Sequence, residues 1–176
     1  MSSNRVLASA LALGVSAIPA AGQAAQLAVS LEVPQLSVAE YHRPYVAIWI
    51  ERPDQSAVKT LAVWWEKDKR NNEGAKYLDE LRQWWRKSGR SLDLKADGLS
   101  GPTRAPGKYQ LTFSGAQLAD LAPGTYNLVV EASRETGGRE VVRAPFVWPP
   151  KAAQAAKPAA LKGARELGAV TLAAKP

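Results

Sequence analysis

Apolar and polar residues alternate along much of this chain, which is the pattern of a β-strand with one buried face. In residues 27–35, Leu or Val stands at every second position up to 33, with Ser and Glu between them. Residues 44–51 are apolar almost throughout, which predicts a central strand covered on both faces. Residues 58–65 follow a turn-like segment that contains Pro53 and Asp54, so we expect them to form a hairpin with that strand.

The second half of the chain predicts four more strands. Residues 108–113 alternate again and place two aromatic residues and a Leu on one side. Residues 125–135 and 139–148 flank Gly137-Gly138, a strong signal for a tight hairpin turn. Residues 166–174 resemble one more short strand, which we expect at an edge of a sheet.

The spacing of apolar residues changes to that of a helix in residues 75–89. Large apolar side chains recur every three to four positions around Leu81, acidic residues precede basic ones, and Gly89 provides a stop. Gln83 lies off this apolar stripe. The charged residues 66–74 show no period, so the sequence predicts a loop there.

Six or seven short strands and one amphipathic helix favour a mainly β fold, an antiparallel β-sandwich of immunoglobulin-like type. A low-complexity run of Ala, Pro and Lys over residues 149–164 predicts a linker. The predicted organisation is a signal peptide (1–24), a β-sandwich domain (25–148), that linker (149–164) and a C-terminal segment that can add a final edge strand (165–176).

The composition excludes several kinds of active site. The chain has no Cys, which rules out disulfides, iron–sulfur clusters and thiol catalysis. Its one histidine, His42, rules out a site with several His ligands and favours a structural role. Glu66, Asp68 and Glu73 stand among basic residues, which is typical of a solvated loop and not of a calcium loop. Since no nucleophile elbow or carboxylate pair is evident, no hydrolase is indicated.

The N-terminus has the features of a targeting segment. Arg5 precedes an apolar run over residues 6–18, Pro19 ends it, and small residues follow at Gly22 and Ala24. This pattern predicts a secretory signal peptide that is cleaved after about Ala24. We therefore expect export of the mature protein, into a bacterial periplasm.

The basic charge of the chain is unevenly distributed. The formal net charge is +7, and residues 149–176 carry five basic residues against Glu166. A nucleic-acid-binding protein concentrates its charge on a folded face, and here much of it lies in a predicted linker and tail. The sequence thus favours weak contact with anionic lipid or a partner protein over nucleic acid.

Two pairs of tryptophans are further candidates for binding, Trp64-Trp65 and Trp84-Trp85. Neighbouring side chains in a strand point to opposite faces, so one of Trp64 and Trp65 is expected in the core. Core packing is the predicted role of three of the four tryptophans. A tryptophan that pointed outward would be a candidate binding contact.

Several stretches of the chain, taken in order, resemble a known family. These stretches are YHRPYVAIWIE, TLAVWWEK, YLDELRQWWR, DGLSGPTRAPGKYQLTF and PGTYNLVVEASRETGGRE. They are similar to the predicted periplasmic family called domain of unknown function 2271, over residues 26–174. The resemblance implies an immunoglobulin-like sandwich. Residues 107–132 also resemble, at the level of the fold, the repeat unit of the sandwich domain in the flagellar hook-capping protein.

The family has no established activity, but the resemblance of this chain to it implies redox partners. Its members tend to be encoded beside membrane proteins with a PepSY domain and beside periplasmic flavin transferases, which attach FMN through its phosphate to a Thr or Ser hydroxyl. The acceptor motif resembles Asp-x-x-Ser/Thr-Gly-Ala-Thr. This chain matches it at Asp97, Ser100, Gly101 and Thr103 and has Pro102 where the motif has Ala. The resemblance thus implies cofactor binding at these four residues, with FMN on Thr103.

These observations lead to one functional interpretation and one alternative. The first is a non-catalytic periplasmic accessory protein that carries covalent FMN and transfers electrons for a PepSY-type membrane reductase. The alternative is a cofactor-free interaction or adhesion module, because Asp, Ser, Gly, Pro and Thr are also ordinary loop residues.

Overall fold

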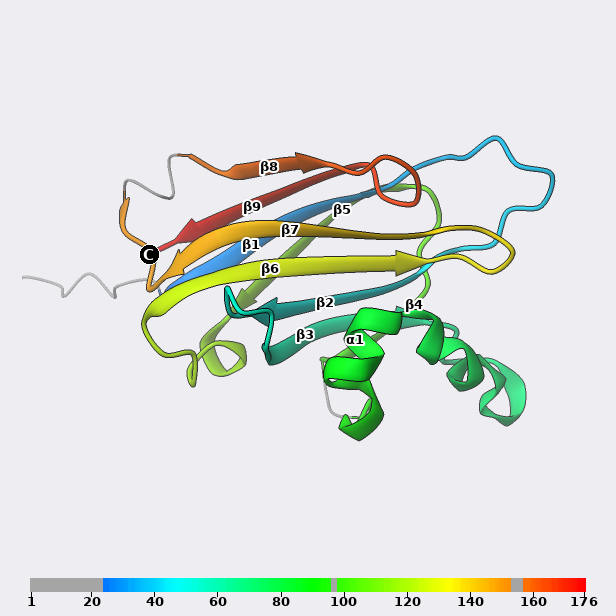
Figure 1. Ribbon diagram of the computed structural model, residues 1–176, viewed down its shortest axis with the longest axis horizontal. Helices are drawn as coiled ribbons and strands as arrows, with labels where there is room; N and C mark the ends of the chain where they lie inside the picture. Colours follow the sequence, from blue (N-terminus) through cyan, green and yellow to red (C-terminus); the bar gives the residue numbers. More distant parts are fainter. Residues whose placement is uncertain (1–23, 96–97, 153–156) are drawn as a thin grey trace, which may run out of the picture.

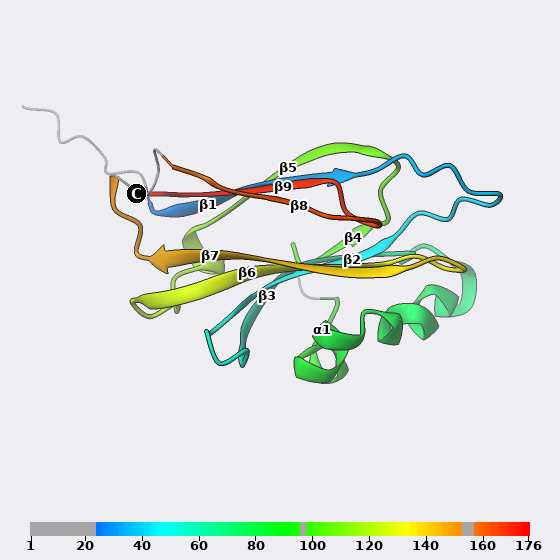
Figure 2. The same cartoon turned by 45° about the horizontal axis from the view of Figure 1, so that its top comes forward.

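Two β-sheets pack face to face, and a group of short helices covers the outer face of the larger sheet (Figures 1 and 2). The computed structural model describes residues 24–95, 98–152 and 157–176. Within them the predicted mainly β architecture is confirmed. The predicted signal peptide lies outside the described residues, apart from Ala24.

The smaller sheet has four strands, which are antiparallel throughout. In spatial order they are β5 (Gly107–Ser114), β1 (Gln26–Val33), β9 (Ala169–Lys175) and β8 (Ala159–Lys162). The larger sheet has five strands, and only its β3–β4 pair is parallel. In spatial order they are β4 (Ser100–Pro102), β3 (Ala57–Trp65), β2 (Tyr45–Glu51), β6 (Gly124–Ser133) and β7 (Arg139–Trp148).

The main core lies between the sheets and follows the alternation of the sequence. Every second residue of β1, from Leu27 to Val33, is buried there, as predicted. All seven residues of β2 are buried, because one face of this central strand meets the other sheet and the other lies beneath the helices. The predicted hairpin of β2 and β3 is also confirmed.

The outer layer begins with η1 (Arg70–Glu80) and continues through α1 (Arg82–Lys87) and η2 (Gly89–Ser91). The prediction of one continuous helix over residues 75–89 is wrong, and so is the prediction of a loop throughout residues 66–74. Leu81 has φ −76° and ψ 66°, which interrupts the helix. The apolar stripe survives this break, since Leu78, Leu81 and Trp84 are all buried against the sheet.

Leu81 is completely buried, which gives a direct test of this outer layer. We expect Leu81→Asp to lower the free energy of unfolding by about 4 kcal/mol, because the new carboxylate would have to be buried without a partner. Urea denaturation would measure the loss. Lys76→Asp is the matched control, since Lys76 is exposed in η1. Equal losses in the two variants would contradict the packing described here.

The C-terminal part of the chain is built into the smaller sheet. The predicted linker contains β8, and β9 lies between β1 and β8 and not at the edge where the sequence analysis placed it. β9 is an inner strand because it pairs with β1 on one side and β8 on the other, while Val170, Leu172 and Ala174 enter the core between the sheets. No helix among the described residues is long and apolar enough to cross a membrane.

Candidate functional site

The candidate acceptor motif lies at the edge of the larger sheet, in a segment we call the β4 corner (Ser100–Arg104). The sequence analysis treated these residues as a loop, whereas Ser100–Pro102 form a short strand parallel to β3. The Ser100 hydroxyl donates to the carbonyl of Leu94 at 2.6 Å and accepts from Trp65 Nε1 at 3.2 Å. Ser100 thus ties the corner to the sheet and to the segment that precedes it.

Gly101 and Pro102 complete the strand. A Cβ atom on Gly101 would lie 3.3 Å from the Trp64 ring, so the glycine lets the backbone approach this tryptophan closely. Pro102 pairs in register with Trp65 and is exposed. Asp97, the first residue of the motif, lies outside the described residues. The structure therefore brings together three of the four predicted site residues, Ser100, Gly101 and Thr103.

Thr103 follows directly after β4 and is half-buried. Its hydroxyl has no hydrogen-bond partner among the described residues, and no described base contacts it. A hydroxyl without an adjacent base is a weak nucleophile at neutral pH. No described residue therefore activates this hydroxyl as a nucleophile.

Arg104 brings a cation and two aromatic rings to the same corner. Its guanidinium lies 5.3 Å from the ring centroid of Trp64 and 5.5 Å from that of Tyr109, within the range of cation–π contacts. The two rings meet edge to face at 5.5 Å. A hollow of about 340 Å³ is lined by these three residues together with Gly101. It offers an anion a cationic partner beside an aromatic surface.

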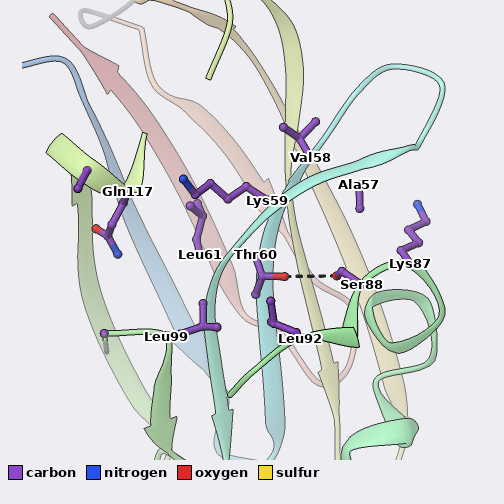
Figure 3. Close-up of a pocket in the computed structure, with 12 residues that line it drawn as sticks. Ala57, Val58, Lys59, Thr60, Leu61, Lys87, Ser88, Leu92, Leu99 and Gln117 are labelled. Atoms are coloured by element: carbon purple, nitrogen blue, oxygen red, sulfur yellow. Dashed lines mark hydrogen bonds between the residues drawn. The ribbon is translucent and has the colours of Figure 1, made fainter. Parts of the chain in front are cut away.

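Figure 3 shows a second hollow, of about 500 Å³. It shares Gly98, Leu99 and Gln117 with the first. Leu61, Leu92 and Leu99 make much of its wall apolar. On the side of α1, the hydroxyls of Thr60 and Ser88 are 3.3 Å apart, and Trp84 Nε1 donates to Thr60 at 3.0 Å. Because these hydroxyls are occupied by each other and by Trp84, this hollow shows no activated nucleophile.

Two buried glutamates were missed by the sequence analysis. Glu51, at the end of β2, has no exposed side-chain surface and accepts from Lys87 Nζ and Arg143 Nε, both at 2.7 Å. Burial raises the pKa of this carboxyl, but the hydrogen bonds and charges of the two basic residues outweigh it and hold the pKa below its usual range. The feature of the sequence that could have indicated this buried ion pair is an acidic residue, Glu51, at the end of an apolar strand.

Glu131, in β6, caps the first turn of α1 from the sheet. It accepts from the backbone N–H of Trp84 at 2.9 Å and from that of Gln83 at 3.1 Å. Burial raises its pKa, and the backbone hydrogen bonds only partly offset this. Gln83 also accepts from Arg143 at 2.6 Å, so this residue is off the apolar stripe but not free of contacts. These glutamates stabilise the helix on the sheet.

The remaining candidates have structural surroundings. His42 Nε2 lies 3.1 Å from Glu40, and His42 Nδ1 lies 3.6 Å from Glu135. Glu66 pairs with Lys69 and accepts from the Tyr45 hydroxyl at 3.2 Å. Within residues 24–95, 98–152 and 157–176, no group of three His, Asp or Glu residues could hold a metal ion.

The tryptophans follow the predicted division. Trp64 faces the core between the sheets, and Trp65 and Trp84 face the layer beneath the helices. Trp85 is the one of the four that is only half-buried. Core packing of three of the four is confirmed, and Trp85 packs at the margin of the same cluster with part of its side chain exposed.

The comparisons with known proteins agree with the resemblance noted in the sequence. No curated protein and no solved structure shows a significant match to this chain. The family model described as "Predicted periplasmic protein (DUF2271)" matches residues 26–169, most of the chain. That match begins just after the predicted cleavage site at Ala24. The chain therefore belongs to the DUF2271 family of predicted periplasmic proteins.

Proposed function

We propose that this protein is a non-catalytic periplasmic accessory protein that carries FMN on Thr103 and transfers electrons for a PepSY-type membrane protein. The observation that carries the proposal is the position of Thr103. Its hydroxyl follows β4 without a hydrogen-bond partner among the described residues, and the next residue in the chain is the cation Arg104. We also assign the sandwich to the immunoglobulin-like type on its two facing sheets, and we place a cleaved signal peptide before it.

The residues of the β4 corner suit a phosphoester of this kind. The Thr103 oxygen would bond to the phosphorus of the FMN half of a flavin dinucleotide, and its proton would leave to a base of the periplasmic flavin transferase. The P–O bond of the pyrophosphate would break, and the nucleoside monophosphate would leave. Arg104 would then stand beside the phosphate, where a charge-assisted hydrogen bond favours an anion. Ser100 and Gly101 hold the strand that presents the threonine.

FMN, when attached, supplies the redox chemistry, and the chain supplies its location and electrostatic surroundings. The Trp64 and Tyr109 rings contact Arg104, which directly follows the proposed attachment residue in the chain. Residues that would take or give protons to a substrate are not required by such a role. This agrees with the proposal that the chain is not itself an enzyme.

One observation favours the second candidate, a cofactor-free interaction module. Ser100, Gly101 and Pro102 are paired with β3, so this part of the motif already has a structural role. Residues 57–62 of β3 pair only with β2 among the described residues, which leaves an edge that another strand could extend. If the protein is an interaction module, the β4 corner is a structural connection between β4 and β5 and carries no cofactor.

Covalent flavin fluorescence after denaturation separates the two candidates. In a host that expresses a periplasmic flavin transferase, we expect the wild type to be labelled and Thr103→Ala to be unlabelled, because the acceptor oxygen is removed. Thr103→Ser should restore labelling. Ser100→Ala should reduce it, and Pro102→Ala should increase it, because Gly101 is freed from the restriction that a following proline imposes.

An unlabelled wild type with a labelled Pro102→Ala variant would mean that this chain works without flavin. Labelling of Thr103→Ala at the level of the wild type would place the attachment elsewhere. Absence of label from the wild type and from all four variants would leave the interaction module as the function.

A further inference from the structure

A hollow of about 420 Å³ lies beside α1 and shares no lining residue with the hollow at the β4 corner. Six residues line it: Asp79, Arg82, Trp85, Arg86, Arg90 and Arg139. Arg82 and Arg86 are one turn apart on α1 and lie on either side of Trp85 in the sequence, while Arg139 is the first residue of β7. The lining thus contains four guanidinium groups and one carboxylate, contributed by elements that are far apart in the sequence.

Three carboxylates, of Asp79, Glu80 and Glu131, stand near the four arginines of this arginine hollow, and they do not lie evenly among them. Arg139 lies 3.6 Å from buried Glu131, whose other contacts are the backbone N–H groups of α1. Arg82 lies 3.9 Å from Glu80, at the limit of an ion pair. Arg86 Nε donates a hydrogen bond to the backbone carbonyl of Arg82. Arg90 has no ion-pair or hydrogen-bond partner among the described residues.

The neighbouring polar hollow shows the contrast. It shares Arg82 and Arg139 with the arginine hollow and has a volume of about 460 Å³. Its lining includes Glu66, Glu80 and Glu135, so acids balance much of its positive charge. The excess of cations is therefore concentrated on the side of Trp85 and Arg90.

The side chains in the arginine hollow suit one kind of anion. A guanidinium presents planar N–H donors that match the oxygens of a phosphate in pairs, which an ammonium group does not. A phosphate group has several acceptor oxygens and carries up to two charges, so more than one arginine can bind it at once. The half-buried Trp85 adds an apolar and aromatic surface beside these donors.

We infer that the arginine hollow binds a phosphate group, held by Arg86 and Arg90 with Arg82 and Arg139 at its sides. The phosphate could belong to a soluble phosphate compound or to the headgroup of an anionic phospholipid. In a headgroup, Trp85 would lie at the level of the membrane interface, where tryptophan is favoured. This site is independent of the flavin proposed at Thr103, because the two hollows share no lining residue.

Two probes distinguish the sources, inorganic pyrophosphate measured by titration calorimetry and vesicles measured by cosedimentation. The vesicles contain phosphatidylglycerol mixed with phosphatidylcholine, or phosphatidylcholine alone. We expect the full mature chain to bind at least one of pyrophosphate and the anionic vesicles. The double variant Arg86→Gln/Arg90→Gln should bind that probe with an affinity at least about tenfold lower, because it loses two charge-assisted donors.

The matched control is Lys108→Gln/Lys162→Gln, which removes the same charge from exposed residues of the smaller sheet. It should keep the affinity of the wild type. Circular dichroism and Tm, measured for both variants, separate lost binding from lost folding. Binding of pyrophosphate alone would identify a soluble phosphate ligand, and binding of anionic vesicles would identify the headgroup.

Three results would overturn the inference. The wild type could bind neither probe. The arginine variant could bind as well as the wild type. The lysine control could lose as much affinity as the arginine variant, which would mean that only net charge matters.

Discussion

A chain that ends at Pro158 should fail to fold, although the removed residues resemble a dispensable tail in composition. The truncation removes β8 and β9, and with them Leu167, Val170 and Leu172, which are buried. Burial of three such side chains contributes about 5–9 kcal/mol, comparable to the whole stability of a small domain. It also exposes the edge of β1, which pairs with β9 from Gln26 to Leu31. Circular dichroism and a melting curve would show the loss.

A pair of point variants gives the control for this truncation. Leu172→Asp places a carboxylate in the core, whereas Thr171→Asp places it on the outer face of the same strand. Only the first should lower Tm strongly. A truncated chain that melted cooperatively near the wild-type Tm would show that the domain folds without β8 and β9, as the sequence-based domain boundaries imply.

The contrast between the core and the C-terminus shows what the sequence could predict. Strands β1, β2, β3, β6 and β7 were found because each alternates or is continuously apolar, and each is bounded by turn residues. The place of β9 could not be predicted, because Val170, Leu172 and Ala174 fit an edge strand as well as an inner one. The order of strands in a sheet depends on contacts that are distant in sequence.

The helix break has a similar origin. The spacing of Leu78, Leu81 and Trp84 correctly predicted which side is buried. It could not predict that Glu131, 50 residues beyond Leu81, would accept the backbone N–H groups that an unbroken helix would use internally. At the candidate site, the sequence identified Ser100, Gly101 and Thr103 but not the ring contacts of Arg104. These contacts depend on Trp64 of the larger sheet meeting Tyr109 of the smaller sheet.

Removal of both basic partners of Glu51 should cause the second large loss of stability. In Lys87→Met/Arg143→Met, a carboxylate with no exposed surface would lose both its ion-pair partners. We expect the free energy of unfolding at pH 7 to fall by about 3 kcal/mol or more. Adding Glu51→Met should restore much of it, because an apolar side chain needs no partner. Urea denaturation of the double and triple variants measures both changes.

The pH dependence of this variant should reverse in sign. In the wild type the pKa of Glu51 is lowered, so its contribution to stability is complete above the ordinary pKa near 4.5 and is lost as pH falls below it. In the double variant only burial remains, which raises the pKa, so protonation favours the folded state. Its Tm relative to the wild type should therefore rise as pH falls from 7 to 5. A difference in Tm that stayed constant over this range would contradict the claim that the unpaired carboxylate of Glu51 causes the loss of stability.

The most direct test of the proposed function is the intact mass of the wild-type protein. It should be purified from the periplasm of a host that also expresses a flavin transferase and then digested to locate any modification. We predict a mature chain that begins near Ala25 and carries one FMN, on the peptide that contains Thr103. An unmodified mass under these conditions, with the transferase shown to label another acceptor in the same cells, would contradict the proposal that this protein is a flavin carrier.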